Sequence, residues 1–202
     1  MYLRTRRTGT LRVTPDTLNV GFRVAVIDEP REVPALVDLF DRALVRARRH
    51  ALALGGHGLA DDLRVIAGLD KDRRLPGVTG VSQAWVDRTS KGRGMAHMVD
   101  TRHDVADTRT ARLDAPLDAS AVTMCPTSTR DAELTAATSL TRCLAIALTV
   151  AWHRDAYRWD GTFSVRNAIA SVAWDRFTEL TQADIVGSID RGNLSGRTGA
   201  SA

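Results

Sequence analysis

The densest group of side chains with metal-binding chemistry lies at His97, Asp100, His103 and Asp104. Imidazole and carboxylate are common ligands of divalent metals. On an extended strand, however, residues 97 and 103 share a face but lie about 20 Å apart, which is too far for one ion. We therefore predict no metal site and no cofactor from this group.

The remaining reactive side chains form no catalytic pattern. The sequence contains no Gly-x-Ser-x-Gly turn, no phosphate loop and no dinucleotide-binding glycine pattern. His50 and His57 flank the Gly55-Gly56 pair, and His153 stands beside Arg154 and Asp155. We leave the catalytic residues unassigned and predict no small-molecule ligand.

Two cysteines, Cys125 and Cys143, are too few for a disulfide framework and lack metal-ligand spacing. They allow one bridge or two free thiols, and the sequence does not decide between these states. Because Cys143 falls within an apolar stripe, we expect its thiol to be buried and inert.

Basic side chains offer a different chemistry. Lys and Arg total 28 against 24 Asp and Glu, a net charge of +4 that is carried almost entirely by arginine. Codon bias in a GC-rich genome explains such a skew, and so does the binding of phosphates or carboxylates by guanidinium groups. The composition leaves both explanations open.

Three basic groups are candidates for contact with nucleic-acid phosphates. One is a stripe on a predicted helix, in which Asp38 stands one turn before the first arginine. The others lie in a predicted mobile arm at residues 1–10 and on a predicted glycine-rich hairpin tip. Their members are Arg42, Arg46 and Arg49; Arg4, Arg6 and Arg7; and Lys91 and Arg93.

Hydrophobic periodicity predicts the elements that position these groups. Apolar and polar residues alternate over 18–26, which indicates a strand that pairs with 11–13 across Pro15-Asp16. The period then changes to that of an amphipathic helix over 33–54, which we expect to end at Gly55-Gly56. We predict further strands at 63–66, 81–86, 95–101 and 105–113.

The last third is predicted to be helical. Ser128 and Asp131 form a capping box before a broad apolar helix over 131–150. Ser164 is positioned to cap a second helix that continues to residue 180, and another capped turn follows to residue 189.

These elements predict an α+β fold, with an antiparallel sheet, an N-terminal hairpin, one packed amphipathic helix and a helical C-terminal third. Residues 11–190 are expected to form one domain, between the arm at 1–10 and a mobile tail at 191–202. We find no signal peptide and no transmembrane segment, and expect a cytoplasmic or virion protein with no membrane partner.

One family shares part of this pattern. A Pro-Asp turn joins two similar strands in Gly9-Thr10-Leu11-Arg12-Val13-Thr14-Pro15-Asp16 and 18–26. An amphipathic helix, the segment Gly58-Leu59-Ala60-Asp61-Asp62-Leu63-Arg64-Val65 and an Ala-rich helix at 131–150 follow in order. This order resembles the SIMPL domain, whose members are usually exported. The resemblance implies an α+β fold that self-associates into rings or larger assemblies and supplies no catalytic residues. Residues 76–126 and 153–202 have no counterpart.

Three functions follow from these observations. The first is a non-enzymatic structural protein that assembles into a homo-oligomer through strand edges and the broad apolar helix, because surplus apolar surface needs a partner. The alternative is a phage or virus-like coat or nucleic-acid-associated protein with basic arms, and the third is a small-molecule enzyme. The expected oligomer contacts are Leu140, Leu144, Leu148 and Ala151.

Overall fold

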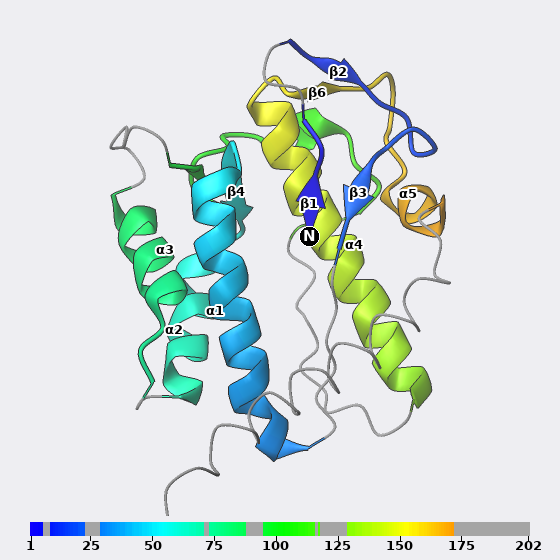
Figure 1. The fold of residues 1–202 in the computed structure, drawn as a ribbon. Helices are drawn as coiled ribbons and strands as arrows, with labels where there is room; N and C mark the ends of the chain where they lie inside the picture. The colour runs from blue at the N-terminus through cyan, green and yellow to red at the C-terminus, as the bar shows by residue number, and fades with distance from the viewer. Residues whose placement is uncertain are drawn as a thin grey trace, which may run out of the picture.

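The computed structural model describes residues 1–5, 9–22, 29–70, 73–87, 95–115, 117 and 129–171. Within these ranges the fold is of the α+β class, as predicted, with an antiparallel strand pair near the N-terminus (Figure 1). The helices are α1 Val33–His50, α2 Leu59–Leu69, α3 Pro76–Val86, α4 Thr129–His153 and α5 Val165–Ser171, with 3-10 turns η1 Pro30–Glu32 and η2 Thr108–Ala111. The strands are β1 Tyr2–Leu3, β2 Leu11–Arg12, β3 Val20–Gly21, β4 Ala53–Gly56, β5 His97–Asp100 and β6 Tyr157–Arg158.

The strand pairing near the N-terminus differs from the predicted hairpin. β3 pairs antiparallel with β1, whereas β2 pairs parallel with β6, so 11–13 and 18–22 are not partners; residues 23–26 of the predicted strand lie outside the described ranges. Val13 and Leu18 are instead buried in a core cluster with Tyr157, and burial of these side chains outweighs the short-range pairing that the turn suggests. The ordered chain also begins at β1, within the predicted arm; residues 6–8 of that arm lie outside the described ranges.

The amphipathic helix α1 is confirmed, but it ends four residues earlier than predicted. The chain leaves the helix at Ala51, which is extended, and the Gly55-Gly56 pair belongs to β4. A Cβ atom at Gly55 would lie 2.6 Å from a Val150 methyl carbon, and one at Gly56 would lie 2.7 Å from the Leu59 Cβ. These glycines therefore permit close packing of β4 rather than a left-handed helix cap.

Two predicted strands are helical. Residues 63–66 lie in α2 and 81–86 lie in α3. Short apolar runs fit either period, and here the helical spacing dominates because Val78, Val81 and Trp85 pack together in the cluster that α1 covers.

Of the two remaining strand predictions, one is confirmed and one is wrong. The strand over 95–101 is confirmed as β5, but 105–113 contains η2 and a single bridge from Leu113 to Phe163 instead of a strand. Asp107 accepts a hydrogen bond from the Arg109 N–H and caps that 3-10 turn. The competing local hydrogen bond explains why this stretch is not extended.

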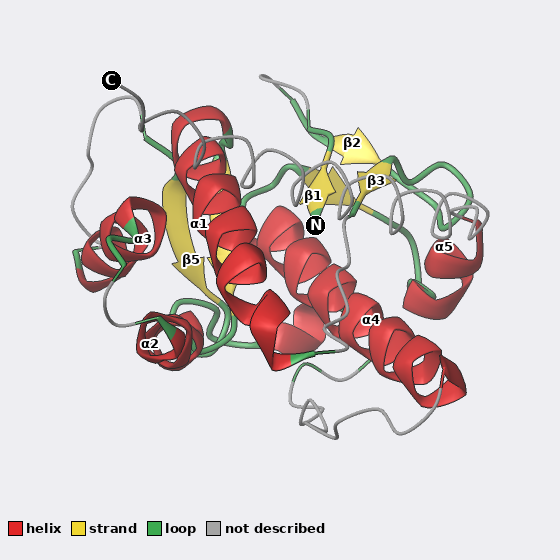
Figure 2. Ribbon diagram, turned by 60° about the horizontal axis from the view of Figure 1, so that its bottom comes forward, coloured by secondary structure: helices red, strands yellow, loops and turns green. Residues whose placement is uncertain are grey.

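α4 is the central helix of the chain. It lies between the group formed by α1, α2 and α3 and the group formed by β1, β3 and α5 (Figure 2). Leu144, Ala145 and Leu148 are fully buried in a cluster with aromatic side chains from β6 and the segment after it. The helix predicted over 131–150 is thus confirmed as a core helix; residue 128, the expected cap, lies outside the described ranges.

The four expected oligomer contacts on α4 are core residues. Leu140, Leu144, Leu148 and Ala151 are each at most 6% exposed within the single chain. Their apolar breadth is explained by packing on two sides, so this helix face is not a surface for a second copy. The window Thr135–His153 is also long and apolar enough to cross a membrane, with a mean hydropathy of 1.3. Core helices meet that criterion too, and the burial of α4 indicates such a helix.

Ser164 caps α5 as predicted. Its hydroxyl accepts a hydrogen bond from the Asn167 N–H at 3.3 Å and donates one to the Asp114 carboxylate at 2.7 Å. Asp114 also accepts the Val165 N–H at 2.7 Å. A negative charge at the first turn of a helix is favourable. The described part of the helix ends at Ser171, so the predicted extension to residue 180 and the tail at 191–202 lie outside the described ranges.

A buried carboxylate fixes α1 against α3. Asp41 of α1 is 5% exposed and accepts a hydrogen bond from the Val78 N–H at 2.8 Å. The N-cap residue of α3, Leu75, has no side-chain acceptor, so Asp41 satisfies one of the free N–H groups from the neighbouring helix. Gly77 allows this approach, because a Cβ atom there would overlap the Asp41 carbonyl oxygen.

We expect Gly77→Ala to lower the free energy of unfolding by about 1–3 kcal/mol, because the added methyl group overpacks a backbone contact. The matched control is Gly68→Ala in α2, where a Cβ atom meets no atom within 4 Å. That change is expected to raise stability by about 0.5–1 kcal/mol, since alanine favours helix. Urea unfolding of both variants measures the difference, and equal effects would contradict the close contact.

A second expectation concerns Tyr157, whose hydroxyl donates to the Arg4 carbonyl oxygen at 2.6 Å. Burial raises the pKa of Tyr157 above its usual value of 10.0. The neutral phenol is therefore the form that folding favours, and its contribution to stability is complete below pH 10 and lost as the pH rises beyond it.

Tyr157→Phe should cost about 1 kcal/mol at neutral pH through the lost hydrogen bond and should flatten the fall in stability between pH 9 and 11. Tyr2→Phe is the control, because Tyr2 is 69% exposed. Unfolding free energies at each pH test this, and an equally steep fall in the Tyr157→Phe variant would contradict it.

Candidate nucleic-acid interface

The helix α1 presents its arginines opposite its buried side. Val37, Asp41 and Leu44 are its buried residues, whereas Arg42, Arg46 and Arg49 are exposed. Spacings of four and three residues place the three guanidinium groups on one helix face. We call Arg42, Arg46 and Arg49 the arginine stripe.

Asp38 neutralises one end of the arginine stripe. Its carboxylate lies 2.8 Å from Arg42 Nη2, which confirms the predicted pair, and 3.5 Å from Arg73 Nη2. Arg73 comes from the connection between α2 and α3 and also reaches the Pro34 carbonyl oxygen. Exposed ion pairs of this kind contribute little to stability. Because two arginines share one carboxylate, a net positive charge remains at the surface.

Arg46 and Arg49 have no ion-pair partner among the residues that the structure describes. Arg49 stands in the last turn of α1 together with Arg48 and His50. Positive side chains there interact favourably with the helix dipole. This part of the helix gathers cationic charge without a compensating carboxylate in the described ranges.

Arg48 has a structural role instead. Its guanidinium packs against Gly80 of α3, and its Nε atom is buried without a hydrogen-bond partner in the described part of the chain. Its carbonyl oxygen accepts the Ala96 N–H at 2.9 Å and so links the end of α1 to the segment before β5. The helix therefore divides its arginines between packing and solvent.

Of the other basic candidates, the described residues include Arg4 alone. Arg4 is exposed, and its carbonyl oxygen is the acceptor for Tyr157. Arg6, Arg7, Lys91 and Arg93 lie outside the described ranges. The candidate interface is thus built from α1 and Arg73.

The group at residues 97–104 forms a hydrogen-bonded network. Asp100 is 2% exposed and accepts N–H groups from Gly58, from Arg102 and from the Trp85 indole. The Thr101 hydroxyl donates to the Gly56 carbonyl oxygen, and its oxygen lies 3.0 Å from His57 Nδ1. No group of three or more metal-ligating side chains occurs in the ranges that the structure describes. The network joins the ends of β4 and β5 and positions the start of α2.

Cys143 contradicts the expectation of a buried thiol, because it is exposed on α4. Its neighbours Leu140 and Leu144 point into the core, and a residue one position before Leu144 falls on the solvent side of the helix. Cys125 lies outside the described ranges.

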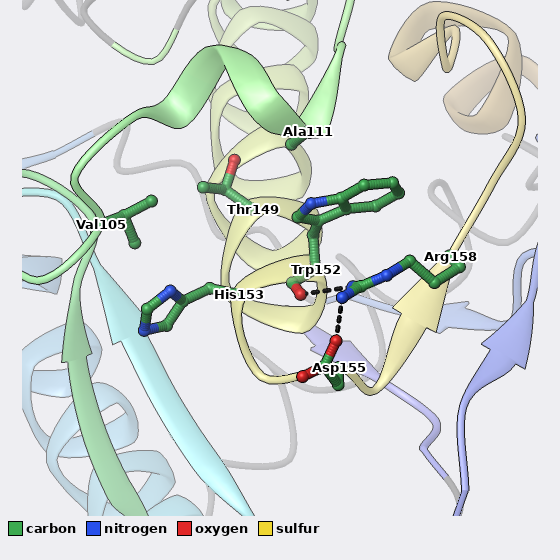
Figure 3. Close-up of a pocket in the computed structure, with 7 residues that line it drawn as sticks. All are labelled: Val105, Ala111, Thr149, Trp152, His153, Asp155 and Arg158. Atoms are coloured by element: carbon green, nitrogen blue, oxygen red, sulfur yellow. Dashed lines mark hydrogen bonds and ion pairs between the residues drawn. The ribbon is translucent and has the colours of Figure 1, made fainter.

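A pocket at the C-terminal end of α4 was not predicted from the sequence. It has a volume of about 290 Å³ and opens to solvent (Figure 3). Segments that are distant in the sequence meet there, so no local motif marks it. The lining residues are Val105, Ala111, Thr149, Trp152, His153, Asp155 and Arg158.

Comparisons with known proteins give this chain no family. No family model, no curated protein and no solved structure matches it. The resemblance to the SIMPL domain therefore stays a prediction.

Proposed function

We propose that this protein binds nucleic acid through its phosphate groups, using the arginine stripe of α1. The observation that carries the proposal is the exposure of Arg46 and Arg49 on the face of Arg42, with no carboxylate partner among the described residues. Nucleic-acid backbones carry closely spaced negative charges, and a group of exposed guanidinium groups on one helix face can neutralise them.

The spacing of the arginine stripe suits a phosphate backbone. Seven residues of helix separate Arg42 from Arg49, which corresponds to about 10 Å along the axis. Each guanidinium is planar and donates two parallel hydrogen bonds to one phosphate. Phosphate contacts position a protein on the backbone but carry no sequence information, so the proposal is binding without sequence preference.

The double substitution Arg46→Gln and Arg49→Gln tests this proposal. Two phosphate contacts would be lost, so the slope of log K against log salt for single-stranded DNA should become shallower by about 1.4. Fluorescence anisotropy between about 50 and 200 mM salt measures the slope.

The matched control is Arg64→Gln with Arg166→Gln, which removes the same net charge from exposed positions on α2 and α5. It should leave the slope near that of the unmodified protein. If both double variants lose affinity equally, the effect is one of net charge, and the arginine stripe is not the interface.

Self-association is the second candidate. The face of α4 that first suggested it is buried, but α2 offers another apolar surface. Val65 is 65% exposed and Leu69 is 55% exposed, and their spacing of four residues places them on one helix face. This pair supports a contact between copies, with strand edges as the other predicted contribution.

If α2 forms such a contact, substitution of Val65 and Leu69 by Lys should reduce the native mass measured by light scattering to that of one chain. The mass should not change for Ala60→Lys and Ala67→Lys, which add the same charges at other exposed positions of α2. A single-chain mass for the unmodified protein would rule this candidate out.

A further inference from the structure

We propose that the pocket at the C-terminal end of α4 binds a nucleobase of a single-stranded nucleic acid. The proposal rests on the function proposed above and names a second contact for the same ligand: phosphates on the arginine stripe and one base in the pocket. Its support is the chemistry of the lining side chains, the charge at this end of α4 and the position of the pocket relative to α1.

A stacked pair of planar groups forms one wall of the pocket. The Arg158 guanidinium carbon lies 4.4 Å from the centre of the Trp152 ring. The Trp159 ring packs against another side of Trp152, with the two ring centres 4.6 Å apart. Arg158 also donates to the Trp152 and Tyr157 carbonyl oxygens and pairs with Asp155. The wall is therefore held in place. Because Arg158 and Trp159 already pack against the Trp152 ring, the Arg158 guanidinium plane is the surface on which an unstacked base would pack.

Polar groups around the pocket are free to contact the edge of a base. Within the described part of the chain, neither the Trp152 indole N–H nor the His153 imidazole has a hydrogen-bond partner. Figure 3 shows the indole nitrogen on the side of Thr149, and His153 near Val105 across the pocket. Donors and acceptors at the rim of a small, partly apolar pocket match the alternating groups on a base edge.

The local charge favours a base over a phosphate. The pocket lies at the C-terminal end of α4, where the helix dipole gives a partial negative charge. The guanidinium that the described residues contribute to the lining, that of Arg158, is already paired with Asp155. A phosphate would therefore gain little binding energy here, whereas an uncharged base is not repelled.

The pocket and the arginine stripe lie toward the same end of the molecule. In Figure 1, α1 and α4 both run upward, and their C-terminal ends lie at the top with β4 beside them. Arg46 and Arg49 occupy the last part of α1, and the pocket surrounds the last turn of α4. We therefore expect one strand of nucleic acid that crosses this end to contact both.

The first experiment uses free nucleosides, so it tests the pocket without the arginine stripe. Adenosine and uridine should give saturable chemical-shift changes in the protein NMR spectrum. Val105→Trp, which fills the pocket, should weaken this binding by about tenfold or more. Ala67→Trp, at an exposed position of α2 outside the Val65 and Leu69 pair, is the matched control and should have no effect.

His153→Ala is the second variant, because an exposed side chain without a partner in the described ranges can be removed without disturbing the core. It should weaken nucleoside binding severalfold even if Val105→Trp fails to fold. Inorganic phosphate is the comparison ligand. Shifts at the pocket with phosphate alone, or no shifts with either nucleoside, would overturn the proposal.

The second experiment separates the two proposals. An oligodeoxynucleotide in which every thymine is replaced by an abasic site should bind the unmodified protein about tenfold more weakly than the intact oligodeoxythymidine, whereas Val105→Trp should bind the two equally. If the salt slope becomes shallower in the Arg46 and Arg49 variant but the unmodified protein binds no nucleoside, the pocket proposal alone is overturned. Nucleoside binding with an unchanged salt slope would overturn the phosphate interface and leave the pocket as a heterocycle site.

Discussion

The contact between Asp41 and the start of α3 is the constraint on which the candidate interface depends. Asp41 must face Val78 to accept its N–H, and Gly77 lets the two backbones approach. This contact fixes the rotation of α1 about its axis. Because the arginine stripe lies on the other side of the helix, the contact that buries one carboxylate also holds the arginines in solvent.

The long helices could be predicted from the sequence because their apolar spacing is unambiguous. α1 and α4 both carry stripes that span several turns, and Ser164 caps α5 through its own hydroxyl. The misassigned segments are short. Residues 63–66 and 81–86 contain too few positions to separate a period of two from one of 3.6. Their packing against each other and against α1, a tertiary effect, favours the helical period.

The arginine stripe and the pocket also differ in how far the sequence predicts them. The arginine stripe and the pair of Asp38 with Arg42 follow from spacing within one helix, so they could be predicted. The pocket brings Val105 and Ala111 beside the end of α4 and Arg158 from β6. Its stacked wall depends on the turn after α4, where Asp155 adopts a positive φ of 55° and directs the chain into β6. No single stretch of sequence encodes that arrangement.

The parallel pairing of β2 with β6 has a consequence for synthesis of the chain. The Thr10 hydroxyl donates to the Asp155 carbonyl oxygen, 145 positions further on, and β2 pairs with β6. β2 therefore has no strand partner until the ribosome has made nearly all of the described chain, whereas β1 can pair with β3 early. The cluster beneath α1, α2 and α3 needs only residues 33–98. We therefore expect folding during translation to begin in that half, with β2 pairing only after the C-terminal third has been made.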